Sequence, residues 1–346
     1  MRQPLTKQQV IEAVERTSAN AEVPLFMCKW WGNGTAEKYG EELTEIAGKY
    51  PDDIFVSWYT APGTDKSPLE NPQYRFGYKD DYNDTARHSI GEEPELLPDW
   101  NELELFLQDF PNPHEEGSFD NVIADVAEAG ERYKIGGFWY FFHERLWAIR
   151  GMENLFMDYY DHLEELKIVA NRLLEFYKVI VDRYAELGFD GIFTSDDLGH
   201  QTGPMMSPSV FKEFYLPLYK DFIAHVHSKG MHLFLHSCGD NTLLMDYLID
   251  AGLDVFHPVQ KGCMDEAETA ENYGNKITFL YGIDVQHLLP EGSVEEVKAE
   301  IIDAAKMFYK KEGGLLFAAG NGIMPDVPLE NIEVMLDTVT NIREYI

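Results

Sequence analysis

Cysteine and basic residues are scarce in this chain of 346 residues. The three cysteines, Cys28, Cys238 and Cys263, exclude a fold held together by disulfide bonds and favour a reducing compartment. Lysine and arginine number 28 against 61 aspartate and glutamate residues, which gives a net charge of −33. Because so acidic a surface repels nucleic-acid phosphates and anionic membranes, we expect neither as a partner and attribute the acidity to solubility.

Long hydrophobic runs are also missing. No run approaches the roughly 20 apolar residues that a membrane-spanning helix needs, and the first residues lack the apolar core of a signal peptide. Thr6 and Gln9 instead have the spacing of a helix capping box. These absences predict a cytoplasmic protein. No GxGxxG motif follows the first predicted strand, so nothing supports a dinucleotide-binding fold.

One short pattern recurs along the chain, in which a predicted helix ends at a glycine and an apolar strand follows. Glycine adopts the left-handed conformation at little cost, and such runs are typical of parallel strands covered by helices. The pattern occurs at Gly130, Gly188, Gly230, Gly252, Gly274 and Gly313. Segments 23–31 and 53–59 also predict strands, separated by a helix over residues 35–49. Strands and helices alternating eight times predict an α/β fold, a (β/α)8 TIM barrel, in one domain spanning residues 1–346.

The segment 61–117 departs from this pattern. It follows the second predicted strand and is rich in proline, aspartate, asparagine and tyrosine. A structureless loop of this length is uncommon in a compact domain unless it has a function. We therefore predict a lid-like insertion that packs over the C-terminal mouth of the barrel.

Polar and aromatic side chains follow nearly all the predicted strands, at the end where barrel enzymes have their active sites. A purely structural barrel has no need of so many polar groups on one face. The candidates for substrate binding are Trp30, Trp58, Tyr59, Trp139, Gln260, Asp284 and Asn321. The aromatic members of this set predict an aromatic-lined pocket.

The most informative motif is LFLHSCGD, in which His236 and Cys238 stand two residues apart at a predicted strand end. Side chains at this spacing point to the same face of a strand, and imidazole and thiolate are the ligands that zinc prefers. Two ligands alone do not hold a zinc ion, however. The spacing by itself therefore leaves open both a metal site and a buried histidine beside a small core cysteine.

Three carboxylates are candidates for acid–base catalysis. Asp196 and Asp197 directly follow a predicted strand, and either could act as a general base or anchor hydrogen bonds. The alternative is a helix cap with a solvated neighbour. Glu144 ends the aromatic run FWYFFHE, where a buried carboxylate is costly, so we expect it to pair with Arg145, Arg150 or a metal.

The order of several motifs resembles that of the uroporphyrinogen decarboxylase superfamily. The motifs are RLWAIRGMENLFMD, DDLGHQTGPMMSP, LFLHSCG, DVFHPVQ, YGID and GNGIMPDVPLENI. The similarity runs from about residue 140 to the C-terminal end and is greatest to the branch of zinc-dependent, corrinoid-linked methyltransferases and demethylases. This resemblance implies a (β/α)8 barrel, in agreement with the strand count.

The resemblance also implies a zinc site with an altered ligand set. In that branch the H-x-C pair binds zinc together with a second cysteine from a turn after the last strand. The corresponding turn here is 320–323, with Asn321 in place of that cysteine, and an amide is a poorer zinc ligand than thiolate. The resemblance therefore implies a weakened zinc site at His236 and Cys238, completed by a carboxylate such as Glu144.

Uroporphyrinogen decarboxylase itself is a poorer match. That enzyme holds the carboxylates of its substrate with an arginine-rich N-terminal motif, R-Q-A-G-R. The first predicted strand here ends in MCKWWGNG, which contains no arginine. A tetrapyrrole that carries many carboxylates would need such a clamp, above all in so acidic a chain.

The sequence therefore predicts a methyltransferase that acts on a small O- or N-methyl compound. The acceptor would be the corrinoid of a partner protein, with zinc or an acid assisting at the leaving heteroatom. The aromatic pocket would hold a methoxyaromatic ring or, by cation–π attraction, a methylammonium group. Two alternatives remain open: a decarboxylase of a smaller acid, and a non-catalytic binding protein of the same fold.

Overall fold

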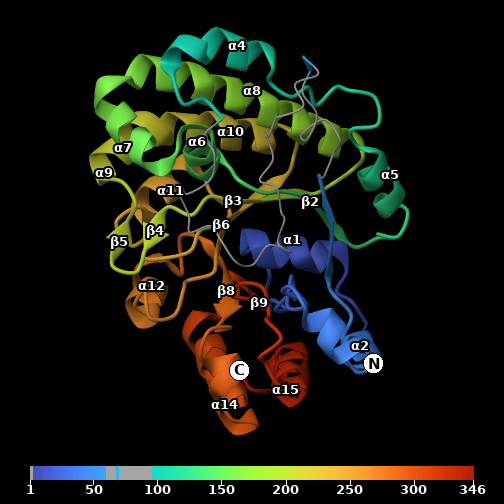
Figure 1. Cartoon of the computed structure of the whole chain (residues 1–346). Coiled ribbons are helices and arrows are strands. Elements are labelled where there is room, and N and C mark those ends of the chain that lie inside the picture. The colour runs from blue at the N-terminus through green and yellow to red at the C-terminus, as the bar shows by residue number, and fades with distance from the viewer. Residues whose placement is uncertain (1–2, 60–67, 70–95) are drawn as a thin grey trace.

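The computed structural model describes residues 3–59, 68–69 and 96–346. Among these residues, a curled sheet of seven parallel strands forms the centre of the molecule, and helices cover its outer face (Figure 1). The strand order is β1-β2-β3-β6-β7-β8-β9. The bounds are β1 Ile54–Trp58, β2 Tyr133–Phe138, β3 Gly191–Ser195, β6 His232–His236, β7 Val255–His257, β8 Thr278–Ile283 and β9 Leu315–Ala319. Each of these strands lies where the sequence predicted one, and the predicted α/β barrel class is confirmed.

The predicted strand over 23–31 is wrong as a regular strand, because the segment forms only isolated bridges in the described part of the chain. It nevertheless links the two edges of the sheet. The Phe26 N–H donates to the Phe317 carbonyl at 3.0 Å, and the Asp53 N–H donates to the Leu25 carbonyl at 3.3 Å. Met27 has a φ of 56°, which interrupts the extended conformation that a ladder requires. An irregular segment therefore stands between β9 and β1, where an eighth strand was expected.

The space enclosed by the curled sheet is filled by apolar side chains of the strands. A buried cluster contains Ile54, Ile135, Phe193, Phe234 and Leu316, one residue from each of five strands. Side chains of helix α1 (Lys7–Glu15) join this cluster and pack against its end. The helix begins with the capping box predicted at its N-terminus.

The helices have the following bounds: α2 Thr35–Lys49, α4 Leu103–Gln108, α5 Asp120–Val126, α6 Phe142–Arg150, α7 Met152–Asp161, α8 Leu163–Glu186, α9 Pro208–Val210, α10 Leu216–Ser228, α11 Met245–Ala251, α12 Glu266–Tyr273, α13 Leu288–Glu291, α14 Val294–Phe308 and α15 Leu329–Thr340. A short hairpin of two antiparallel strands of two residues each, β4 Gly199–His200 and β5 Gly203–Pro204, follows β3. No helix in the described ranges is long and apolar enough to cross a membrane.

The glycine pattern is confirmed with one exception. The glycines before β2, β3, β6, β7 and β9 have positive φ angles, as the left-handed conformation requires. Gly274 is the exception, with a φ of −58°. A Cβ at this position would lie 2.5 Å from the carbonyl oxygen of Ala270. Gly274 therefore serves a close backbone approach, and the expectation of a left-handed residue there is wrong.

Much of the predicted lid over 61–117 lies outside the described residues. The part from residue 96 onward is anchored to the helices after β2. The Leu97 N–H donates to the Ile149 carbonyl at 2.8 Å, and the Trp100 indole donates to Asp158 at 3.0 Å. Asp158 also accepts from the buried Arg150 guanidinium at 2.6 Å. A lid over the barrel mouth stays a prediction.

Candidate active site

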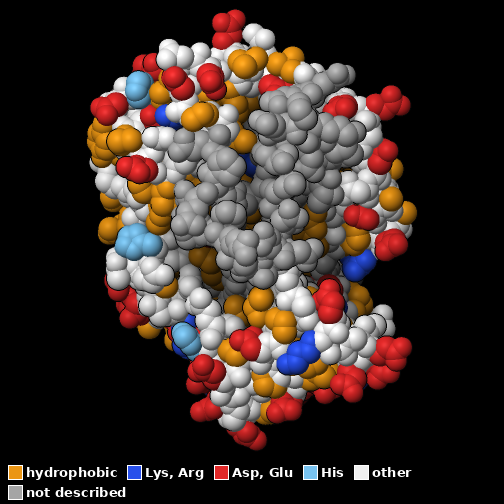
Figure 2. All heavy atoms as spheres, in the orientation of Figure 1, with side chains coloured by type: hydrophobic (Ala, Val, Ile, Leu, Met, Phe, Trp, Pro, Cys, Tyr) orange, Lys and Arg blue, Asp and Glu red, His pale blue; other side chains and the backbone are white. Residues whose placement is uncertain are grey.

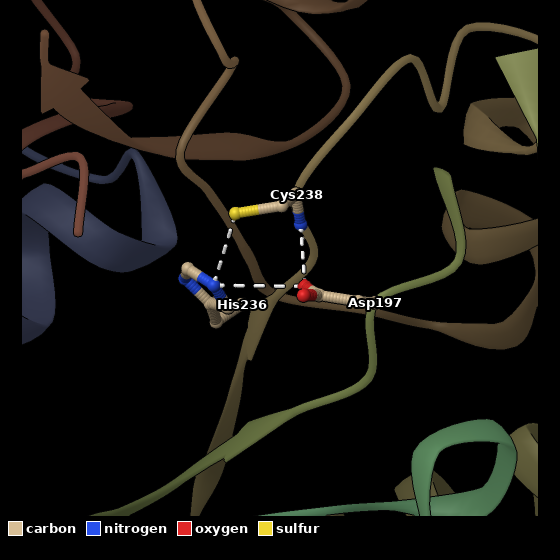
Figure 3. A group of neighbouring side chains, drawn as sticks. All are labelled: Asp197, His236 and Cys238. Carbon is tan, nitrogen blue, oxygen red and sulfur yellow. Dashed lines mark hydrogen bonds and ion pairs between the residues drawn. The ribbon is translucent and has the colours of Figure 1, made fainter. Parts of the chain in front are cut away.

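Three potential metal ligands converge at the carboxyl ends of β3 and β6 (Figure 3). His236 ends β6 and lies opposite Ser195 in the register of the sheet, so Asp197, two residues beyond Ser195, reaches the same place. The His236 Nε2 lies 3.3 Å from the Cys238 Sγ and 3.6 Å from the Asp197 Oδ1. Asp197 also accepts from the backbone N–H of Cys238 at 2.8 Å, which holds the carboxylate beside the pair.

The geometry of these three residues fits zinc. Their ligand atoms, a nitrogen, a sulfur and an oxygen, all lie within 4.8 Å of one another. Ligands bound to one zinc ion at about 2.0–2.3 Å in a tetrahedron are themselves roughly 3–4 Å apart. Three protein ligands leave one position open, as catalytic zinc sites do. The carboxylate that joins His236 and Cys238 is Asp197, and not Glu144, which was expected in this place.

Burial controls the protonation of the pair in the metal-free protein. It raises the pKa of the Cys238 thiol well above its ordinary value, and the charges of Asp197 and Glu144 raise it further. Burial also lowers the pKa of the His236 imidazole. The thiol and a neutral imidazole are therefore the forms present at neutral pH.

A second histidine lies behind His236. The His257 Nδ1 is 2.7 Å from the His236 Nδ1, and the His257 Nε2 is 3.0 Å from the carbonyl oxygen of Ala319. Burial, and then the neighbouring His236, lower the pKa of His257 well below its ordinary value, so this ring is neutral too. His257 ends β7, and this position at a strand end is the signal that marks it in the sequence.

Asn321 stands at the edge of the cluster. Its Nδ2 lies 3.9 Å from the Cys238 Sγ, and its Oδ1 accepts from the Gly322 N–H at 2.7 Å. Asn321 stands where the methyltransferase branch that this sequence resembles has its second zinc-binding cysteine. Its side chain thus faces the sulfur of Cys238.

Two further carboxylates lie in the interior next to the cluster. The Ser195 hydroxyl donates to the Glu144 Oε2 at 2.6 Å. The Glu144 N–H and the Tyr219 hydroxyl donate to the two oxygens of Asp196, at 2.9 and 2.6 Å. Burial raises the pKa of Asp196 to about 7. Burial, together with the charges of Asp197 and Asp196, raises that of Glu144 well above its usual range.

The position of Glu144 differs from the expectation. Strand β2 ends at Phe138, and Glu144 lies in the first turn of α6. Its hydrogen-bond partner is Ser195, whereas Arg150, one of the expected partners, pairs with Asp158. Glu144 is therefore a buried carboxyl group whose raised pKa favours the protonated form.

Tryptophan rings form a wall against the His236 imidazole. Trp58 and Trp139 stack with ring centroids 4.8 Å apart and planes inclined by 5°, and Trp30 lies 5.4 Å from Trp139. The Trp30 and Trp139 rings lie 5.8 and 6.2 Å from that of His236. All three tryptophans line an open cavity of about 580 Å³. Tyr59 packs against Phe119, 4.9 Å between ring centroids, and is not among the residues that line this cavity.

A second cavity, of about 430 Å³, is lined by Cys238, Gln260, Asp284 and Asn321. The Gln260 Oε1 accepts from the Gly239 N–H at 2.6 Å and so supports the turn after Cys238. Asp284 accepts from the backbone N–H of Gln286 at 2.8 Å and shapes its own loop. The structure thus brings three of the predicted polar residues to one cavity. Substrate binding by them stays a prediction.

Comparison with known proteins finds a matching family and two similar methyltransferases. The sequence profile of the family described as uroporphyrinogen decarboxylase (URO-D) matches residues 147–342, more than half of the chain. A methylated-thiol–coenzyme M methyltransferase from Methanosarcina mazei is 24% identical over 128 residues, which are 37% of this chain and 32% of that protein. The match thus spans about a third of that relative. A solved methyltransferase structure from Methanosarcina mazei has a TM-score of 0.65 at 16% identity, covering 98% of this chain and 99% of the other.

Proposed function

Because the chain belongs to the uroporphyrinogen decarboxylase family, we propose that it is a methyltransferase within it. It takes a methyl group from a small O- or N-methyl compound and passes it to the corrinoid of a partner protein. The observation that carries this proposal is the cluster of Asp197, His236 and Cys238 beside the rings of Trp30 and Trp139. The names of the two relatives support methyl transfer as the reaction class.

The tryptophan wall supplies the binding surface for the methyl donor. Indole faces attract both aromatic rings and methylated ammonium groups, and a cation over such a face gains roughly 0.5–2 kcal/mol. Trp30 and Trp139 each lie about 6 Å from the His236 ring, between centroids. We propose that a donor stacked on this wall turns its heteroatom toward the cluster.

The buried acid completes the reaction. When the bond between the methyl carbon and an ether oxygen breaks, the oxygen keeps the electron pair and needs a proton, whereas the nitrogen of a methylammonium donor leaves as a neutral amine and needs none. Burial and neighbouring carboxylates raise the pKa of Glu144, which favours its protonated form. Its Ser195 hydrogen bond orients the carboxyl group. We propose that Glu144 protonates the leaving heteroatom. Asp196 would keep Glu144 in place by accepting a hydrogen bond from the backbone N–H of Glu144.

Zinc fits the same site. His236, Cys238 and Asp197 would hold it, and zinc bound there would act as a Lewis acid toward the leaving heteroatom. The tryptophan rings and Glu144 would act without zinc. The rings would bind the donor and exclude water, and Glu144 would supply the proton.

The test uses cobalamin reduced to the Co(I) state as acceptor. The purified protein is mixed with it and with a methoxybenzoate, a methylamine or a methyl thioether, the last because one relative acts on methylated thiols. Loss of the Co(I) absorbance with one donor class is the expected result. Glu144→Gln should lower kcat by about 10²–10⁴-fold, whereas Glu164→Gln, on the surface of α8, should leave it unchanged.

Two other results would replace the proposal. Release of carbon dioxide from a small carboxylic acid, with the Co(I) signal unchanged, would identify a decarboxylase. Tight binding of a methylated compound without any turnover would identify a binding protein.

A further inference from the structure

A chain of polar contacts runs from the end of β9 to the three candidate metal ligands. The carbonyl oxygen of Ala319 faces the His257 Nε2 at 3.0 Å, and the His257 Nδ1 faces the His236 Nδ1 at 2.7 Å. The His236 Nε2 then faces the Cys238 Sγ at 3.3 Å and the Asp197 Oδ1 at 3.6 Å. The two imidazoles are only 3% and 1% exposed, so water does not replace any of these contacts.

The carbonyl at one end determines where the protons lie. A carbonyl oxygen only accepts, so the His257 Nε2 must carry a hydrogen and donate it to Ala319. A neutral imidazole carries one hydrogen, which leaves the His257 Nδ1 as an acceptor. The His236 Nδ1 must then be the donor of the 2.7 Å contact. The His236 Nε2 consequently carries no hydrogen.

We propose that His257 is a positioning residue that holds His236 in the tautomer protonated at Nδ1. The Nε2 lone pair of His236 is thereby directed at Cys238 and Asp197 before any ligand arrives. The opposite tautomer would present an N–H group to the sulfur and would have to rearrange before Nε2 could bind a metal. The proposal concerns the proton positions in the free protein; its consequence for zinc rests on the function proposed above.

Packing around His257 keeps the ring in this place. The next residue, Pro258, lies against Gly282, where a Cβ would come within 2.3 Å of the Pro258 Cβ and 2.7 Å of the Gly320 Cα. The Gly282 N–H also donates to the Pro258 carbonyl at 2.8 Å. The loop after β7 therefore has little room to move, and the histidine pair keeps its spacing.

Nitrogen-15 NMR of the zinc-free, full-length protein tests the proton positions directly. The chemical shifts of ring nitrogens separate protonated from unprotonated sites, and the His236 signals are assigned as those lost in His236→Gln. We expect a protonated Nδ1 and an unprotonated Nε2 for His236, and the reverse for His257. Finding the His236 proton on Nε2 would overturn the proposal, whether or not the protein transfers methyl groups.

Two variants of His257 test the consequence for metal binding. His257→Leu fills the space but accepts no hydrogen bond, whereas a glutamine amide in His257→Gln can both accept and donate, as the neutral imidazole does. Zinc dissociation constants are measured by competition with a chromophoric chelator, with circular dichroism as the check on folding. We expect His257→Leu to bind zinc about 10- to 100-fold more weakly and His257→Gln to remain close to the parent. Equal affinity in the parent and a folded His257→Leu variant would contradict the proposal.

The two experiments separate the two proposals. If the parent binds no zinc, the proposed metal assistance fails, and the tautomers in the NMR spectrum still decide the role of His257. If His257→Leu does not fold, the spectrum of the parent is sufficient by itself.

Discussion

Single side chains decide how strongly the cluster can hold a metal. Thiolate is a better zinc ligand than an amide oxygen, and the cluster has one cysteine. Asn321 points its amide nitrogen toward the sulfur of that cysteine at 3.9 Å. A protein purified without added metal should therefore contain less than one zinc per chain.

Two substitutions test this ligand set. Cys238→Ala should abolish zinc binding, because two protein ligands, His236 and Asp197, do not retain the ion. Asn321→Cys should tighten binding, since it adds a thiolate beside the first. Metal analysis of the parent and both variants after dialysis against micromolar zinc measures this. If neither the parent nor Asn321→Cys takes up zinc, the three residues are not a metal site.

Asp196 makes stability depend on pH. Its pKa is about 7 in the folded protein, against an ordinary value of 3.8, so the folded state retains a proton that the unfolded state has lost. The stabilisation from this proton is complete below about pH 4 and is lost as the pH rises toward 7. Asp196→Asn does not titrate. The free energy of unfolding of the parent, relative to this variant, should fall by about 2 kcal/mol between pH 5 and 7.

Urea unfolding of both proteins at several pH values measures the difference. Asp246→Asn, on exposed α11 surface, is the control and should show no such trend. A constant difference between parent and Asp196→Asn would mean that Asp196 is ionised throughout this range.

At the level of whole elements, two adjacent glycines, Gly136 and Gly137, allow β2 to pack closely between helix α8 and the tryptophan wall. The Tyr184 hydroxyl, from α8, donates to the carbonyls of Ser57 and Gly137 at 3.0 and 2.8 Å, which links β1 and β2. A Cβ on Gly136 would lie 2.3 Å from the Tyr184 ring, and one on Gly137 would lie 2.4 Å from Trp58. The absence of side chains at these two positions of β2 therefore allows both the helix contact and the position of Trp58.

Gly136→Ala should consequently destabilise the fold. The added methyl group must displace the buried Tyr184 ring, and such overpacking costs about 1–3 kcal/mol. Gly48→Ala is the matched control, because a Cβ at Gly48, in α2, meets no atom within 4 Å. It should raise the free energy of unfolding by up to about 1 kcal/mol. Denaturant titrations compare the two, and equal effects would show that the Tyr184 contact is not rigid.

The charge of the whole molecule limits the substrates it can take. Figure 2 shows acidic side chains spread over the described part of one face, with few basic ones among them. The net charge of −33 disfavours any polyanion that approaches from solution. Near the site, Lys29 is paired with Asp52 at 2.7 Å, and Arg150 with Asp158 at 2.6 Å. These cations are therefore already engaged by carboxylates of the protein.

We accordingly expect no useful turnover of uroporphyrinogen, despite the family name. Its carboxylates would need a cluster of arginines, and the first predicted strand contains none. Anaerobic incubation and chromatographic detection of coproporphyrinogen measure this. Product formation at an ordinary enzymatic rate would instead support the decarboxylase alternative.

Much of the fold follows from local patterns. Apolar runs after glycines predicted six of the seven strands, segment 53–59 predicted β1, and Thr6 three positions before Gln9 predicted the capping box of α1. These signals are local because each depends on residues a few positions apart. The same is true of His236 and Cys238, whose spacing alone places both at one strand end.

The remaining features depend on contacts between distant segments. Asp53 accepts from the backbone N–H groups of Leu5 and Leu25, at 2.8 Å each, and so fixes the irregular segment where a strand was predicted. Asp197 joins His236 because β3 and β6 are neighbours in register, although β4, β5 and α10 separate them in the chain. His257 reaches His236 across β6 and β7 in the same way. Local spacing determines which groups stand at the strand ends, and strand pairing decides which of them meet, because pairing brings together residues that no short-range pattern relates.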